Sequence, residues 1–315
     1  MGHGGYHNRS PRHAIAAAIS YREFAPAPEL SGVVRAYFSF MPYADRTGHR
    51  RITREALVAA GQPFNLPMLA DARSSFVLDL TATCHVNRGW SPAAADARVI
   101  GPRRVARQPA ADDRQEMVGA YLEPGAILQL FGMPATEFTD RTLRLEDLWG
   151  PQSQELLVEA PGLDEASRVD RVEAALLARR RCQRSSSTVD VAAMTYWVQA
   201  HPNAITVNRL AEMAGVSRRH LSRIFGDVVG VSPKRFCRLA RFRAGLVYAG
   251  VGAAVPWAEV AAHLGYADQS HMIAEFRELS GLTPEMLASR PWFHPFILDV
   301  QGRITRSPNS ISMQQ

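Results

Sequence analysis

The sequence has almost no lysine and little cysteine. Lys234 is the one lysine among 36 Lys and Arg residues, so the arginine content reflects a bias over the whole chain and does not by itself indicate phosphate binding. Cys84, Cys182 and Cys237 lie too far apart for paired CxxC metal ligands, and three cysteines do not make a disulfide framework. We therefore expect reduced thiols, no metal and no cofactor.

Long apolar runs and enzyme motifs are absent as well. No run approaches the roughly 18 apolar residues of a membrane helix, and residues 14–19 are too few for the apolar region of a signal peptide. This predicts a soluble, cytoplasmic protein without a membrane partner. The sequence also has no HxH, HExxH, GxSxG or GxxxxGK[ST] pattern.

Cys84 beside His85 is the strongest remaining arrangement for a nucleophile. Neighbouring residues of a strand point to opposite faces, which favours a structural role for this pair. A methyl-accepting repair function would need several cysteines at metal-ligand spacing, and these are missing. We therefore expect that the protein is not an enzyme.

The length and the hydrophobic content indicate two globular domains. The chain has 315 residues, about twice a common domain size, with 46% hydrophobic and 21% charged residues. Alternating patterns over residues 34–40 and 76–80, with a further strand at 117–122, predict a β-rich first half. Beyond residue 188 only helical periodicity remains. The predicted fold class is α+β, a β-rich N-terminal domain followed by an all-α domain.

The proposed division of the chain follows composition. A Ser- and Arg-rich stretch without an apolar face predicts a linker. An apolar stripe over residues 163–177 predicts one amphipathic helix, which either packs on its own domain or forms a dimer seam. We expect a disordered arm at 1–20, a sensor or dimerisation domain at 21–178, the linker at 179–188, a helical domain at 189–290 and a disordered tail at 291–315.

The helical half contains the same unit twice, at an offset of 50 to 51 residues. Ala211, Gly215 and Ser217 recur as Ala261, Gly265 and Asp268. The glycine allows the left-handed conformation that ends a first helix, and Ser or Asp then caps the second helix. In both units a Gly and a Ser-Pro or Thr-Pro pair follow, as Gly230 to Pro233 and Gly281 to Pro284.

This pattern predicts two helix-turn-helix motifs joined by a connecting helix. Leu221, Ile224 and Phe225 have the spacing of an inward face, which leaves Arg218, Arg219, Ser222 and Arg223 pointing outward from the first recognition helix. Residues 234–249 predict a connecting helix of roughly 24 Å, suited to recognition helices in two successive major grooves about 34 Å apart.

Basic residues are concentrated in the same region. Residues 218–243 contain eight Arg or Lys and one acid, Asp227, whereas the whole chain has a net charge of +6. Because acids are scarce in this window, it predicts a positive surface for phosphate.

These residues resemble the AraC/XylS family of transcription regulators over residues 189–290. The resemblance implies base contacts from the two recognition helices and a role in activation. Ala274 replaces a frequent arginine of the family. The expected DNA-binding residues, including backbone contacts, are Arg218, Arg219, Ser222, Arg223, Arg235, Arg238, Gln269, Ser270, His271, Ala274 and Arg277.

The first half resembles a less well characterised sensor module. The similarity rests on residues 121–126, 130–134 and 139–141. Expected partners are double-stranded DNA and RNA polymerase, with a small-molecule effector and a homodimer left open. The alternative is a DNA-binding adaptor whose first half binds another protein.

Overall fold

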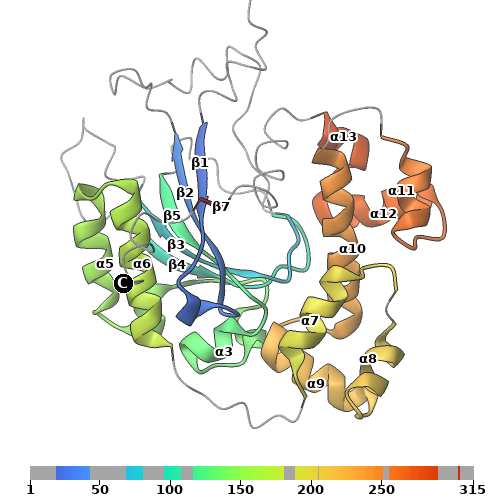
Figure 1. Ribbon diagram of the computed structural model, residues 1–315, viewed down its shortest axis with the longest axis horizontal. Helices are drawn as coiled ribbons and strands as arrows, with labels where there is room; N and C mark the ends of the chain where they lie inside the picture. The colour runs from blue at the N-terminus through green and yellow to red at the C-terminus, as the bar shows by residue number, and fades with distance from the viewer. Residues whose placement is uncertain are drawn as a thin grey trace, which may run out of the picture.

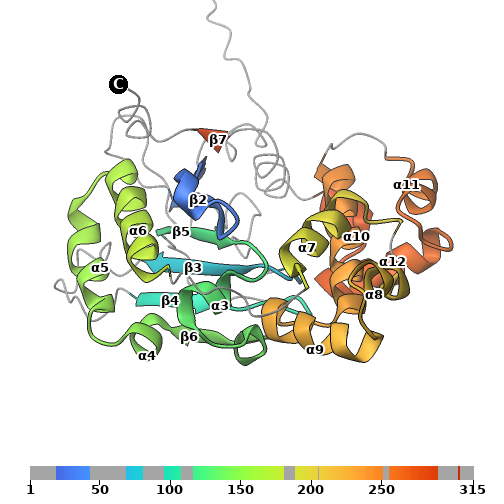
Figure 2. The same ribbon diagram turned by 60° about the horizontal axis from the view of Figure 1, so that its bottom comes forward.

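The computed structural model describes residues 19–42, 69–80, 96–107, 116–180, 189–204, 206–250, 255–289 and 304–305. It has an antiparallel sheet in the first half and a group of helices in the second, which confirms the predicted α+β class. In Figures 1 and 2 the helices of the second half lie on the opposite side of the sheet from α5 and α6.

Within the described residues the sheet has seven strands, in the order β6-β4-β3-β5-β2-β1-β7. Neighbours pair antiparallel except β1 and β7, which are parallel. The strands are β1 (Ile19–Phe24), β2 (Val34–Pro42), β3 (Ser74–Asp79), β4 (Asp96–Ile100), β5 (Met117–Leu122), β6 (Thr142–Arg144) and β7 (Ile304–Thr305).

One face of the sheet is covered by short helices and by the amphipathic helix α6. Val169, Val172 and Leu176 of α6 are buried in the same core as Phe76 of β3 and Ala120 of β5. The helix expected over residues 163–177 therefore packs on its own domain. The elements of this layer are η1 (Pro28–Leu30), α3 (Ala126–Phe131), η4 (Ala135–Phe138), α4 (Leu145–Trp149), α5 (Ser153–Glu159), η5 (Ala160–Gly162) and α6 (Glu165–Arg179).

Three features of the sheet depart from the sequence patterns. β1 begins at Ile19, inside the expected arm, and β7 comes from the expected disordered tail. Alternation along β2 predicts one buried face, but Tyr37 and Phe38 are both buried. Tyr37 belongs to the core that α6 covers, whereas Phe38 packs on the other face of the sheet against the Tyr121 ring of β5, with 4.6 Å between ring centroids.

The second half is helical and contains the predicted pair of units. In the first unit α8 (Val207–Met213) is followed by α9 (Arg218–Val229), and in the second α11 (Trp257–His263) is followed by α12 (Gln269–Ser280). α10 (Pro233–Gly250) connects them, and its 18 residues give a length of about 27 Å. The remaining helices are α7 (Val191–Ala200) and α13 (Pro284–Ala288).

Local capping explains where the recognition helices begin. The Ser217 side chain accepts a hydrogen bond from the His220 amide at the start of α9, and Asp268 accepts one from His271 at the start of α12. Gly215 and Gly265 have φ of 64° and 74°, the left-handed conformation predicted for the turn of each motif.

A short segment of the first half belongs to the core of the second. Ala70 and Ala72, which precede β3, are buried in the same apolar cluster as Phe242 and Leu279. The Ala70 amide donates a hydrogen bond of 3.2 Å to the Leu279 carbonyl. The two halves are therefore in direct contact. Of the helices in the described ranges, none is both long and apolar enough to cross a bilayer.

Candidate nucleic-acid interface

The first recognition helix, α9, presents its polar side to solvent at its N-terminal end. Leu221, Ile224 and Phe225 are buried, as their spacing predicts. Arg218, Arg219, Ser222 and Arg223 are exposed. The exposed side chains are therefore available to a ligand along the first two turns.

The arginines of α9 are only loosely held. Arg223 lies 3.9 Å from the Asp227 carboxylate, and both side chains are about half or more exposed. Arg218 donates to Asn208 at 3.4 Å. Exposed pairs of this kind contribute little, so a phosphate or a base edge can replace them at small cost.

The second recognition helix, α12, likewise has a buried apolar side and an exposed polar side. Met272 and Phe276 are buried, in line with their correspondence to Leu221 and Phe225. The predicted contact residues Gln269, Ser270, His271, Ala274 and Arg277 are all exposed.

The basic residues of α10 differ from those of α9, because acids from other elements neutralise most of them. Arg238 Nε lies 2.8 Å from Oε2 of Glu275, and its Nη2 pairs with Glu278. Arg235 Nη1 lies 2.6 Å from Oε1 of Glu278 and also donates to the Arg104 carbonyl. Arg243 pairs with Asp71.

This arrangement corrects the electrostatic argument made from the sequence. The window over residues 218–243 has few acids in sequence, but Glu275, Glu278 and Asp71 lie against it in space. Arg235 and Arg238 would have to leave these ion pairs to meet a phosphate. The free positive charge of the window is therefore smaller than its eight Arg and Lys residues against one acid indicate, because Arg235, Arg238 and Arg243 are paired with acids.

Glu275 is the centre of a buried polar group in the second unit. Its side chain is 3% exposed, and its oxygens accept hydrogen bonds from Arg238 and from the Tyr266 hydroxyl. Burial and the nearby Glu275 carboxylate raise the pKa of Tyr266. Hydrogen bonds from Arg238 and Arg235 lower the pKa of Glu278 to about 2. The network fixes α12 against α10.

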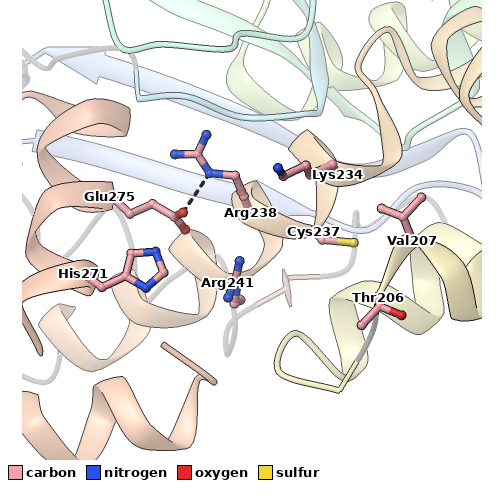
Figure 3. A pocket seen from close by; sticks show the side chains of 8 residues that line it. All are labelled: Thr206, Val207, Lys234, Cys237, Arg238, Arg241, His271 and Glu275. Atoms are coloured by element: carbon pink, nitrogen blue, oxygen red, sulfur yellow. Dashed lines mark hydrogen bonds and ion pairs between the residues drawn. The ribbon is translucent and has the colours of Figure 1, made fainter. Parts of the chain in front are cut away.

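A hollow of about 500 Å³ lies between the two units. Figure 3 shows side chains of α10 along it, with those of α8 and α12 on either side. Its lining is mixed in charge, with Glu275 as its carboxylate. The lining residues are Thr206, Val207, Lys234, Cys237, Arg238, Arg241, His271 and Glu275.

The first half contacts α9 at the end opposite its exposed arginines. The Thr139 hydroxyl donates a hydrogen bond of 2.6 Å to the Gly230 carbonyl, just beyond α9. A Cβ at Gly125 would lie 3.2 Å from Val228, so the backbone of the first half also approaches α9 closely. This contact leaves the N-terminal turns of α9 exposed.

Cysteine chemistry is not prominent at this site. Burial raises the pKa of the Cys237 thiol to about 11, which keeps it protonated and unreactive near neutral pH. Cys84, His85 and Cys182 lie outside the described residues. Within the described ranges, no cluster of three or more His, Cys, Asp or Glu could hold a metal.

Sequence reasoning missed the acidic partners of α10. Arg235 and Arg238 are three residues apart on one helix, and Glu275 and Glu278 are three apart on another. Such spacing places each pair on one helical face. Matching the two faces could have indicated the ion-pair network, whereas nothing local pointed to Asp71.

Two family comparisons match separate parts of the chain. Residues 210–290 match the family described as a helix-turn-helix domain, and residues 22–144 match a domain of unknown function, DUF6597. No curated protein matches the chain.

Solved structures with some similarity include the C-terminal domain of AraT, a response regulator from Geobacillus stearothermophilus. It has 21% identity and a TM-score of 0.30, over 39% of this chain and 91% of that one. An apo variant of ToxT from Vibrio cholerae has 10% identity and a TM-score of 0.40, over 86% and 96%. ToxT bound to (E)-4-(8-methylnaphthalen-1-yl)but-3-enoic acid has 8% identity and a TM-score of 0.37, over 90% and 100%. The chain thus matches the DUF6597 domain in its first half and a helix-turn-helix domain in its second half.

Proposed function

We propose that the chain is a sequence-specific, effector-responsive transcription activator that binds double-stranded DNA through both helix-turn-helix units. The observation that carries the proposal is the exposed polar face of α9, with Arg219, Ser222 and Arg223 outside and Leu221 and Phe225 in the core. In such motifs the N-terminal residues of the second helix contact base edges in the major groove.

The two units would occupy successive major grooves on one side of the duplex. α10 is about 27 Å long at the helical rise, and the recognition helices it connects have equivalent capping and burial. One turn of DNA separates successive grooves by about 34 Å, a span that two helices at the ends of such a spacer can bridge. Recruitment of RNA polymerase and dimerisation are further parts of this proposal.

The first half would regulate the second through their shared core. Ala70 and Ala72 pack within the helical core, and Thr139 bonds to the residue that ends α9. A ligand that shifts the first half would thereby act on the orientation of both units. This contact supports a sensing role for the first half.

The experiment is selection of bound sites from random duplex DNA by the full chain. The full chain is used because Ala70 and Ala72 belong to the core of the helix-turn-helix domain. A guanine contact by Arg223 predicts that Arg223→Ala loses about 1–3 kcal/mol of binding and relaxes preference at one base position.

Arg144→Ala is the matched control, because it removes a 68%-exposed arginine from the first half. It should leave affinity and sequence preference unchanged. Failure of the full chain to enrich any sequence would refute DNA-sequence recognition. An unchanged preference for Arg223→Ala would refute the base-contact role of Arg223 alone.

A further inference from the structure

We propose that the hollow between the two helix-turn-helix units receives the sugar–phosphate backbone of DNA, with Lys234 and Arg241 as the phosphate-binding residues. This inference rests on the proposed function and deepens it. It differs from the sequence prediction, which placed Arg235 and Arg238 among the DNA-binding residues and did not include Lys234 or Arg241.

The hollow has the size and position for a segment of a polymer. It has a volume of about 500 Å³ and is open to solvent on one side, so an extended ligand can enter it. Thr206 and Val207 line it from the first unit, and His271 lines it from the second (Figure 3). A duplex bound by both recognition helices would have to cross this gap.

The charge that remains free in the hollow is positive. Glu275 is 3% exposed and is paired with Arg238, so these two charges compensate each other. Lys234 is exposed and forms no ion pair with the described part of the chain. Together with Arg241, it leaves two cations for an anionic ligand.

Arg241 is held in place by contacts that leave its charge uncompensated. Its Nη1 donates to the Gly265 carbonyl at 3.3 Å, and its guanidinium lies 5.1 Å from the centre of the Tyr266 ring. Neither partner is an anion. A guanidinium fixed in this way needs little ordering to bind a phosphate, which favours binding.

His271 connects the hollow to the expected base-reading surface. It lies in the first turn of α12, beside Gln269 and Ser270, and it also lines the hollow. A backbone segment in the hollow would therefore continue into the groove contacted by α12. The phosphates concerned are those between the two half-sites.

The test combines a protein substitution with neutral phosphates in the DNA. Individual phosphates between the half-sites of a selected operator are replaced by methylphosphonates, and affinity is measured for the full chain and for Lys234→Gln. We expect one or two central replacements to weaken binding of the unaltered protein about 5- to 10-fold, as for loss of one charge-assisted contact. Lys234→Gln should bind unmodified DNA with the same loss of affinity, about 5- to 10-fold. It should lose no further affinity for the duplexes that carry the central methylphosphonates.

Further measurements accompany this test. Lys234→Gln should lower the slope of log affinity against log salt by about 1, whereas Arg144→Gln should not change it. Thermal unfolding of Lys234→Gln should match that of the unaltered chain because Lys234 is exposed. Inorganic phosphate at matched ionic strength should not displace the operator.

Four results would overturn the inference. The first is that Lys234→Gln leaves the DNA affinity and its salt dependence unchanged. The second is that the loss of affinity from Lys234→Gln and the loss from the central methylphosphonates are additive. The third is that the protein binds inorganic phosphate only when Lys234 is present, while its DNA affinity does not depend on Lys234. The hollow would then be a site for a small anion. If the unaltered chain selected no operator, the proposed function would fail together with this inference.

Discussion

Asp71 and Arg243 form an ion pair with 2.6 Å between Oδ2 and Nη1, and the pair joins the segment before β3 to α10. The Asp71 carboxylate also accepts hydrogen bonds from the Arg73 amide and guanidinium. The adjacent Ala70 amide donates to the Leu279 carbonyl at the end of α12. One short segment of the first half thus contacts both α10 and the second helix-turn-helix unit.

This ion pair predicts a non-additive effect on stability. Arg243→Gln should lower the free energy of unfolding by about 1 kcal/mol, since both side chains are roughly a quarter exposed. Asp71→Asn should lower it by more, because it also removes the ion pair with Arg73. The double variant should lose less than the sum, because either change alone removes the same interaction. Urea unfolding of the four proteins measures the coupling. Additive losses would show that the two side chains act independently.

The glycines that end the two recognition helices predict a test of the contact between the halves. Gly230 and Gly281 have φ of 86° and 77°, so alanine is strained at both positions by about 1–2 kcal/mol. At Gly230 a Cβ would also lie 2.9 Å from the Ala135 carbonyl, the Pro102 ring and the Thr139 hydroxyl, whereas at Gly281 it would meet nothing within 4 Å.

Gly230→Ala should therefore destabilise the chain by about 1–3 kcal/mol more than Gly281→Ala, the increment expected for overpacking. Thermal or urea unfolding of the two variants gives the comparison. Equal destabilisation would mean that the two halves separate without cost at this contact.

Much of the helical half could be predicted because its signals are local. Gly215 and Ser217 specify a turn and a helix start through their own backbone and side chain, and their repetition at Gly265 and Asp268 identifies the second motif. The expected strand at residues 117–122 likewise coincides with β5. In each of these places local propensity and tertiary structure agree.

The rest depends on partners that are distant in sequence. Ala70 lies more than 200 residues before Leu279, and its burial in the helical core follows from docking of the halves. The same holds for Glu275 and Arg238, whose pairing depends on how α12 packs on α10. A one-dimensional charge count could not include such partners, so it overstated the free charge of the site.

The buried position of Glu275 predicts the result of removing Arg238. Arg238→Ala would leave the Glu275 carboxylate, 3% exposed, without its cation, a loss of about 3–5 kcal/mol for a buried pair. Since Arg238 is itself 23% exposed, the lower end of this range is expected. Unfolding in urea measures the effect, and Lys234→Ala on the exposed side of the same helix is the control.

Weaker DNA binding by Arg238→Ala would thus follow from instability of the second unit. The added substitution Glu275→Gln should recover part of the stability, because it removes the unpaired charge. Unchanged stability in Arg238→Ala would contradict a structural role and return Arg238 to the set of candidate phosphate contacts.

The low pKa of Glu278 predicts a loss of stability in acid. Hydrogen bonds from Arg238 and Arg235 lower its pKa in the folded state from 4.5 to about 2. Because the folded state binds this proton less readily than the unfolded state, its stabilising contribution is complete above about pH 4.5 and is lost as the pH falls towards 2. Unfolding free energies measured between these limits should rise less steeply with pH in Glu278→Gln than in the unaltered chain. Glu285→Gln, on the exposed side of α13, should keep the original slope, and an identical slope in all three proteins would show that the ion pairs of Glu278 do not contribute to folding.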